Sequence, residues 1–353
     1  MIEFDGVTKV FPDGTTAVDN LNLTLPSGKI TVFVGPSGCG KTTSLRMINR
    51  MVEPTSGRIL IDGADVMSQD PAVMRRSIGY VIQHAGLFPH RTIAENIATV
   101  PRLLGVNRSD AMHAAIEVMG RVGLPASFAT RYPVQLSGGQ QQRVGVARAL
   151  ASDPPVLLMD EPFSAVDPIV REELQTEFLR LQREIGKTIA LVTHDIDEAI
   201  RLGDHIAIFR EHGHLAQFAT PQQLLENPAN EFVANFVGRD RGFRSLSFET
   251  AEKLVTDSLD SLDDRGLALV VDDHRRPVGW AGPGVGSISH PAAISGTFTQ
   301  SDSLRQVTDV VISSPVGVAV RVNEAGIADG VLSHEGLFEQ LAMRRLGKVR
   351  TPL

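Results

Sequence analysis

A glycine-rich run that ends in a lysine and a hydroxyl residue is the strongest chemical pattern in the sequence. It fits G-x-x-x-x-G-K-[ST], in which glycines let successive backbone N–H groups point inward at phosphate oxygens. Lys41 is expected to reach the β- and γ-phosphates of a nucleotide, and the Thr42 hydroxyl to bind Mg²⁺. The predicted phosphate site consists of Gly35, Pro36, Ser37, Gly38, Cys39, Gly40, Lys41, Thr42 and Thr43.

An acidic pair follows the apolar run VLLM at residues 156–159. A carboxylate at the end of a buried strand can face a metal ion beside a phosphate loop, and this role suits Asp160. Its neighbour Glu161 can act as the general base that polarises an attacking water. The alternative, a solvated strand end, is weaker because the phosphate loop lies upstream.

A second anion-binding pattern is the run Leu136-Ser137-Gly138-Gly139-Gln140. Where such a run opens a helix, it offers backbone donors, a hydroxyl group and the positive end of the helix dipole. One nucleotide needs only one phosphate cradle. We therefore expect Ser137, Gly138, Gly139 and Gln140 to serve the nucleotide of another subunit.

Cys39 is the only cysteine of the chain, which excludes an internal disulfide and a cysteine-built metal site. A reducing, cytoplasmic setting fits this best. Because the thiol lies beside Lys41 and a helix start, the sequence predicts that alkylation at Cys39 blocks the phosphate loop. The alternative is that a small side chain simply fits the loop.

These residues need a scaffold of buried strands and intervening helices. Continuous apolar runs at residues 29–35, 155–161, 188–195 and 205–209 are typical of central parallel strands. After the phosphate loop, Leu45, Ile48 and Val52 recur at helical spacing. The pattern predicts an α/β sheet with its active edge at the carboxyl ends of the strands.

In combination, the phosphate loop, the acidic pair and LSGGQ resemble the nucleotide-binding subunits of ABC transporters over residues 2 to 237. The resemblance implies a P-loop ABC-type domain at 1–237, with a RecA-like core and a helical signature subdomain at about 86–153. It also implies ATP and Mg²⁺ as cofactors, and a homodimer of ATPase subunits.

The resemblance assigns further residues to the site. It places Gln83 as the loop glutamine that senses Mg²⁺ and contacts the membrane subunit, and His194 as the switch histidine. Residues 164–167, which end in Asp167, match the loop that crosses the dimer interface, with valine where the family usually has leucine. Phe11 matches the aromatic ring that stacks on adenine, and Val18 is also placed in the nucleotide site.

Residues 194–241 resemble the ATP-binding subunits of quaternary-amine importers, which carry glycine betaine, carnitine, choline or proline betaine. This implies partner permease subunits, an extracytoplasmic solute-binding protein, and a peripheral place on the cytoplasmic face of the membrane. An importer for another small solute, such as an amino acid, is the alternative. A soluble ABC ATPase of repair or translation fits less well, because the chain lacks a second ATPase domain and a long coiled-coil insertion.

The sequence changes character after residue 237. We expect a linker at 238–243, a tandem CBS-like regulatory domain at 244–345 and a basic tail at 346–353. The two weakly similar units are 267–282 and 303–341. The first lacks a clear closing helix, so a nucleotide site between the repeats is in doubt. The positive charges of Arg344, Arg345, Lys348 and Arg350 are either a solvated terminus or a contact for anionic lipid.

Composition limits the remaining classes. A chain of 353 residues with 42% hydrophobic and 21% charged residues suits two globular domains rather than disorder. The net charge of -7 argues against nucleic acid as a partner. The sequence shows neither a signal-peptide pattern nor a run of roughly 18 apolar residues that would span a bilayer. Work at a membrane would therefore require docking to a partner.

Overall fold

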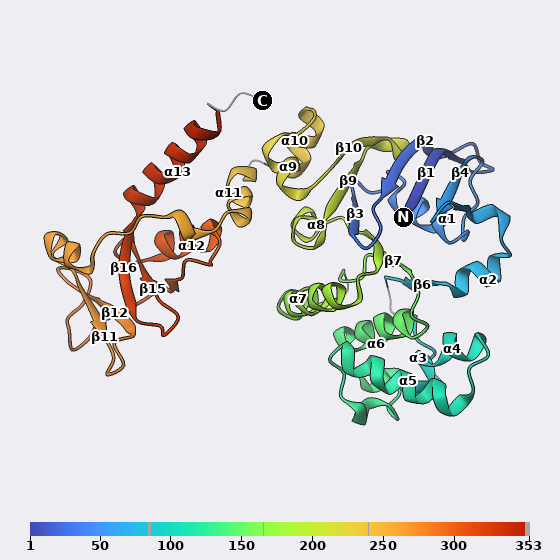
Figure 1. The fold of residues 1–353 in the computed structure, drawn as a ribbon, viewed down its shortest axis with the longest axis horizontal. Coiled ribbons are helices and arrows are strands. Elements are labelled where there is room, and N and C mark those ends of the chain that lie inside the picture. The colour runs from blue at the N-terminus through green and yellow to red at the C-terminus, as the bar shows by residue number, and fades with distance from the viewer. Residues whose placement is uncertain (84–85, 165, 239, 350–353) are drawn as a thin grey trace. The chain divides into compact units, whose positions relative to one another are not determined.

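The computed structural model describes residues 1–83, 86–164, 166–238 and 240–349 (Figure 1). The chain divides into two compact units, Met1–Gly238 and Arg239–Leu353. The residues expected to bind or hydrolyse the nucleotide all lie in the first unit.

A six-stranded sheet forms the centre of the first unit. In spatial order its strands are β10 (Leu215–Ala219), β9 (His205–Phe209), β3 (Ile30–Val34), β8 (Thr188–Val192), β7 (Val156–Asp160) and β6 (Ile78–Val81). All neighbouring pairs are parallel except β10 with β9. The expected parallel sheet and its four apolar strands are confirmed.

Alternate residues of the central strands enter two different cores. On β3, Val32 and Val34 join the core that includes the helical group, whereas Phe33 joins the core around α1. On β7, Leu157 and Leu158 divide in the same way. Both faces of the sheet are therefore covered, which explains why these strands read as unbroken apolar runs.

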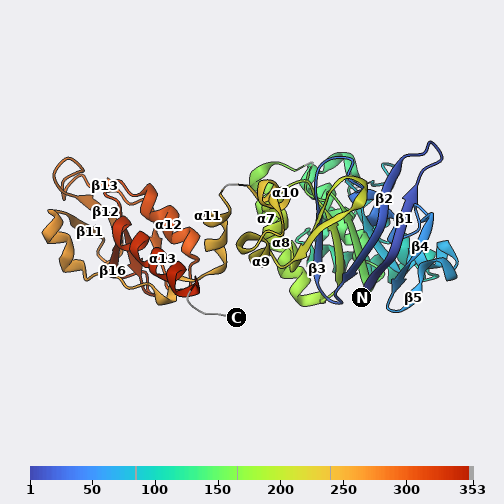
Figure 2. The same ribbon diagram turned by 90° about the horizontal axis from the view of Figure 1, so that it is seen from above.

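A smaller antiparallel sheet lies beside the central one. Its spatial order is β2 (Thr16–Leu25), β1 (Ile2–Val10), β4 (Ser56–Ile61) and β5 (Ala64–Asp65). Figure 2 shows β2, β1 and β4 side by side, in agreement with their antiparallel pairing.

The helices of the first unit fall into two sets. Those associated with the sheets are α1 (Lys41–Ile48), α2 (Pro71–Arg76), α7 (Pro168–Ile185), α8 (Ile196–Leu202), α9 (Pro221–Glu226) and α10 (Glu231–Val237). Those gathered in one helical group are α3 (Ile93–Ile97), α4 (Thr99–Leu103), α5 (Arg108–Arg121) and α6 (Gly138–Leu150) (Figure 1).

One detail of the expected helices is corrected. The apolar spacing predicted a helix that continues past the phosphate loop through Val52, but α1 ends at Ile48 and is capped at Asn49. Arg50 then adopts a positive φ of 53°, which turns the chain out of the helix.

The second unit holds two three-stranded sheets. The first consists of β11 (Ala268–Val271), β12 (Pro277–Ala281) and β13 (Ala292–Ala293), and the second of β14 (Thr297–Phe298), β15 (Val318–Val322) and β16 (Ala328–Ser333). Its helices are α11 (Arg241–Ser245), α12 (Leu304–Ser313) and α13 (His334–Val349).

The two halves of this unit differ as the sequence indicated. Both contain an antiparallel hairpin, β11 with β12 and β15 with β16. Helices α12 and α13 flank the second hairpin, whereas residues 282–296, all of them described, hold no helix. Of the basic residues near the end, Arg344 lies 3.6 Å from Glu249. Arg350 lies outside the described residues, as do the side chains of Arg345 and Lys348.

Candidate functional site

The phosphate loop joins β3 to α1. At two of its positions, only glycine fits. Gly35 has φ 152°, and a Cβ atom there would lie 2.4 Å from the carbonyl oxygen of Phe209. Gly40 has φ 101°, and its Cβ would lie 2.3 Å from the carbonyl oxygen of Ala17. Close backbone contact on both sides therefore fixes the loop. Pro36, Ser37 and Gly38 remain exposed at its tip.

The ammonium group of Lys41 lies inside this loop. Its Nζ donates to the carbonyl oxygens of Gly35 and Pro36, each at 2.8 Å, and the residue is only 7% exposed. The loop thus encloses a positive charge next to backbone donors, which is the electrostatic arrangement that a phosphate requires.

Thr42 and Asp160 meet at the foot of the loop. Thr42 Oγ1 donates to Asp160 Oδ1 at 3.0 Å. The other carboxylate oxygen lies 3.3 Å from Arg46 Nη2 and 3.5 Å from the hydroxyl of Tyr80. Burial raises the pKa of the Tyr80 hydroxyl above its usual value, so Tyr80 acts as a donor here.

This pair suits magnesium by its donor chemistry. A hydroxyl and a carboxylate are hard oxygen ligands, and Mg²⁺ is usually held by one or two carboxylates together with substrate phosphates and water. Among the described residues, no group of three or more His, Cys, Asp and Glu side chains could hold a metal ion. An ion at this position would thus depend on the nucleotide for further ligands.

Glu161, Gln83 and His194 form a second cluster at the same edge of the sheet. Gln83 Nε2 donates to Glu161 Oε2 at 3.1 Å, and His194 Nδ1 lies 3.3 Å from the same oxygen. The Glu161 side chain is 23% exposed, so water can reach it. The Glu161 backbone has φ 47°, which is an unfavourable conformation for glutamate. A hydrogen bond from the Glu161 N–H to the carbonyl oxygen of Val192 helps to hold it.

Helix α6 begins with a reciprocal capping box formed by residues of the second anion-binding run, 137–140, which we call the signature residues. Gln140 N donates to Ser137 Oγ at 3.3 Å, and Ser137 N donates to Gln140 Oε1 at 3.0 Å. Ser137 and Gly138 are exposed at the positive end of a 13-residue helix. Because α6 belongs to the helical group and α1 lies beside the sheets, the structure does not bring the two phosphate cradles together within one chain (Figure 1).

The remaining site candidates differ in accessibility. Phe11 is half-buried, with Lys9 Nζ 5.3 Å from its ring centroid. Val18 is fully buried and packs against the loop at Gly40, so its predicted nucleotide contact stays a prediction. Thr43 is half-buried on α1.

The loop at 164–167 is described in part, because Ala165 lies outside the described residues. Ser164 is half-buried, and its hydroxyl donates to the carbonyl oxygen of Glu161 at 3.0 Å. Val166 is buried, while Asp167 is exposed and accepts a backbone hydrogen bond from Arg171 at 2.7 Å.

Cys39 requires a correction. The sequence indicated a thiol open to alkylation, but Cys39 is 1% exposed and belongs to the core around α1. Its Sγ lies 3.7 Å from Lys41 Nζ and beneath Gly35. The structure therefore favours the alternative, a small side chain that fits under the loop.

Sequence reasoning missed Arg46 and Tyr80, which both contact Asp160. Arg46 lies four residues after Thr42 on α1, so helical spacing could have placed it on the same face. Tyr80 had no such signal, because its place beside Asp160 depends on the pairing of β6 with β7.

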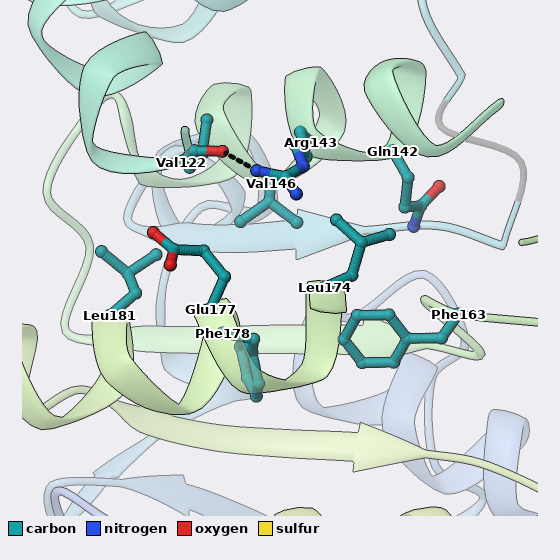
Figure 3. Close-up of a pocket in the computed structure, with 9 residues that line it drawn as sticks. All are labelled: Val122, Gln142, Arg143, Val146, Phe163, Leu174, Glu177, Phe178 and Leu181. Atoms are coloured by element: carbon teal, nitrogen blue, oxygen red, sulfur yellow. Dashed lines mark hydrogen bonds between the residues drawn. The ribbon is translucent and has the colours of Figure 1, made fainter. Parts of the chain in front are cut away.

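A small cavity of about 30 Å³ lies between α6 and α7 (Figure 3). Gln142, Val146, Phe163 and Leu174 are among its lining residues. None of the predicted site residues lines it.

No helix in the described part of the chain is long and apolar enough to cross a membrane.

Known proteins match this chain along most of its length. A family model described as ABC transporter matches residues 18–164. The osmoprotectant import ATP-binding protein OsmV of Salmonella typhimurium is 44% identical over 374 aligned residues, covering 98% of this chain and 97% of that protein.

Two further relatives have a higher sequence identity to this chain over a shorter stretch. The carnitine transport ATP-binding protein OpuCA of Listeria monocytogenes is 54% identical, covering 68% of this chain and 60% of that protein. The glycine betaine/carnitine/choline transport ATP-binding protein OpuCA of Bacillus subtilis is 52% identical, covering 69% of this chain and 64% of that protein.

Solved structures agree with the fold of the first unit. A dimeric ATP-binding cassette in a post-hydrolysis state, bound to ADP and Pi, is 35% identical with a TM-score of 0.56 and covers 63% of this chain and 99% of that chain. The cbiO1 protein of Clostridium perfringens is 26% identical with a TM-score of 0.59 and covers 64% of this chain and 90% of that chain.

Proposed function

The chain belongs to the family of ABC transporter ATP-binding subunits, and on that premise we propose that it hydrolyses ATP to power the import of a quaternary-amine osmoprotectant. The observation that carries the chemical part is the cluster around Glu161. One of its carboxylate oxygens contacts both Gln83 and His194 at the sheet edge that also holds the phosphate loop.

The residues of the cluster and of the phosphate loop divide the tasks of hydrolysis among them. Glu161 is the general base that takes a proton from the water attacking the γ-phosphate. His194 and Gln83 hold the Glu161 carboxylate in place, and His194 also contacts the γ-phosphate. Lys41 and the N–H groups of the loop neutralise the charge that develops on the phosphate oxygens. The face of the Phe11 ring packs against adenine.

Thr42 and Asp160 are proposed to hold Mg²⁺, with the side-chain oxygen of Gln83 as a further ligand. The ion supplies Lewis-acid stabilisation of the phosphate oxygens when it is bound. The hydrogen bond between Thr42 and Asp160 supports this assignment, because it brings the two ligand groups together.

Two copies are proposed to assemble head to tail, as a two-fold symmetric homodimer. The Ser137–Gln140 run of one copy then completes the nucleotide site of the other, and Asp167 lies at the interface. Two observations support this: Ser137 and Gly138 are exposed at the start of α6, and α6 is remote from the phosphate loop of its own chain. ATP holds the halves together, and loss of its γ-phosphate lets them separate.

The motion is proposed to reach integral-membrane permease subunits through the segment after Gln83, roughly residues 86–96. The subunit then lies on the cytoplasmic face of the membrane as a peripheral protein. An extracytoplasmic solute-binding protein would deliver the solute to the permease.

The proposed solute class rests on the relatives. Their printed functions are osmoprotectant import, carnitine transport and glycine betaine/carnitine/choline transport. The near full-length match to the Salmonella protein includes the second unit, which we propose is a tandem CBS-like regulatory domain. The hairpin of β15 and β16 with flanking α12 and α13 supports one such repeat.

The test is reconstitution of the protein with its membrane subunits and solute-binding protein in liposomes. ATP hydrolysis and solute uptake are measured with glycine betaine, carnitine, choline and proline betaine, and with an amino acid and a sugar for comparison. We expect stimulation by at least one quaternary amine and none by the comparison solutes. Stimulation by the amino acid alone would favour the alternative importer class. Glu161→Gln serves as the inactive control.

A further inference from the structure

A buried carboxylate lies behind the cluster described above. Glu198, in the first turn of α8, is 7% exposed although it carries an ionisable group. Its Oε1 accepts a hydrogen bond from Gln175 Nε2 of α7 at 2.9 Å, and Gln175 is 5% exposed. A buried polar pair that joins two helices is costly to break, because either partner alone would be left without its hydrogen bond.

The carboxylate also reaches the backbone around His194. Burial raises the pKa of Glu198, and the side chain of Thr193, the residue immediately before His194, opposes this shift. Thr193 Oγ1 in turn accepts a hydrogen bond from the backbone N–H of Asp195 at 3.1 Å. The contacts of Thr193 therefore hold the chain on both sides of His194.

Gln175, which donates to Glu198, belongs to the helix that directly follows the loop at 166–167. Helix α7 begins at Pro168, directly after Asp167. Arg171 holds this start of the helix, since its backbone N–H donates to the Asp167 carbonyl at 2.7 Å and its Nη2 to the Val166 carbonyl at 3.1 Å. Arg171 also stabilises the charged form of Glu198.

The buried pair of Glu198 and Gln175 thus joins α8, which begins just after His194, to α7, whose first turn Arg171 ties to residues 166–167. We propose that Glu198 is a positioning residue that keeps His194 in register with Asp167, and so links the switch histidine to the segment contributed to the second copy. The inference rests on the proposed function, because the loop at 166–167 has this importance only in the dimer. Glu198 itself would touch neither the nucleotide nor the reacting water.

The test compares Glu198→Ala with the near-isosteric Glu198→Gln in steady-state ATP hydrolysis by the full-length protein. Misplacement of a catalytic group by about 1 Å can cost up to about a hundredfold in rate. We expect Glu198→Ala to lower kcat about tenfold and to change KM for ATP less than about twofold, because substrate binding is not affected. Glu198→Gln keeps an oxygen that accepts from Gln175, and it should restore most of the rate.

A matched control lies on the same two helices. Arg201 of α8 contacts Glu172 Oε1 at 3.0 Å and Thr176 Oγ1 at 2.9 Å, both on α7, but at the protein surface. Arg201→Gln removes a link between the same helices without touching the buried contacts. We expect its kcat to stay within about twofold of the wild type, since exposed ion pairs contribute little.

A second background separates positioning from general loss of structure. If Glu198 acts through His194, then adding Glu198→Ala to His194→Ala should lower the remaining rate less than about twofold, because effects that share one path are not additive. An equal tenfold loss in both backgrounds would overturn the inference, and so would a normal kcat in Glu198→Ala.

The wild type in the same series tests the proposed function separately. A wild type that hydrolyses ATP while Glu198→Ala shows either of these results would overturn the inference alone. A wild type with no ATPase activity would overturn the proposed function together with the inference that rests on it.

Discussion

His194 Nδ1 lies 3.3 Å from Glu161 Oε2, the oxygen that also accepts a hydrogen bond from Gln83. These residues come from three separate segments, each at the carboxyl end of a parallel strand of one sheet. The contact orients a carboxylate that water can still reach. A general base needs such a fixed orientation together with access to the water whose proton it takes.

Glu161→Gln should bind ATP but hydrolyse it at least about a hundredfold more slowly, since a general base is commonly worth 10² to 10⁴ in rate. The amide keeps the shape of the side chain while it loses the ability to take a proton. Single-turnover hydrolysis measures the effect, and size-exclusion chromatography in ATP should show a long-lived dimer. Near-normal turnover would remove Glu161 from the role of base.

Ser137→Arg should abolish hydrolysis while nucleotide binding to the isolated monomer stays intact. The physical reason is that Ser137 is proposed to face the nucleotide of the partner copy, where a large cation leaves no room. Fluorescent-nucleotide binding and ATPase assays measure the two properties separately.

The matched control is Asn107→Arg. Asn107 caps helix α5 in the same helical group, accepts a hydrogen bond from Asp110 N at 3.0 Å and is exposed. It therefore reproduces the loss of a helix cap, about 1 kcal/mol, and the added charge at a distance from α6. If the control is equally inactive, or if Ser137→Arg also loses monomer binding, the two-subunit site is wrong.

Alkylation at Cys39 should be slow in the folded protein and inactivating once it occurs. The thiol is 1% exposed, so reagents reach it only when the loop opens. We expect labelling by N-ethylmaleimide, followed by mass spectrometry, to be at least about tenfold slower than in denaturant. ATP should slow it further by occupying the loop. Fully labelled protein with normal turnover would contradict this assignment.

The sequence alone was sufficient to predict the buried strands and the loop between β3 and α1. Strands buried on both faces must be apolar at every position, so their runs were unmistakable. The glycines of the loop were equally clear, because Gly35 and Gly40 have no room for a side chain. The interior order of the sheet, with β3 between β9 and β8, was not predictable from local pattern.

Contacts between distant segments could not be predicted either, because local sequence pattern does not show which segments meet. The pairing of Thr42 with Asp160 was expected from motif chemistry, but the further contacts of Asp160 with Arg46 and Tyr80 were not. The burial of Cys39 also depends on tertiary packing, and its position beside Lys41 gave the opposite impression. Glu198 gave no signal at all, because a glutamate in the first turn of a helix is ordinary at the surface.

The contribution of Glu198 to the stability of the first unit should fall as pH rises above about 4.5, the ordinary pKa of a glutamate. Burial raises the pKa of Glu198, and the nearby Asp195 acts in the same direction, while Thr193, Gln175 and Arg171 oppose it. A raised pKa means that the folded state binds the proton more tightly than the unfolded state does. The contribution of Glu198 to the free energy of unfolding therefore decreases with pH until its folded-state pKa is passed, and then levels off.

Glu198→Gln removes this titration, so the difference in stability between variant and wild type should grow with pH in favour of the variant. Urea unfolding followed by circular dichroism, from pH 4.5 to about 8, measures the difference. Trp280, the only tryptophan, lies in the second unit, and its fluorescence provides an internal control that the substitution should leave unchanged. A constant difference across this range would mean that Glu198 has the same pKa in both states. A growing difference would show that the protein buries this carboxylate, four residues after His194, at a cost in stability.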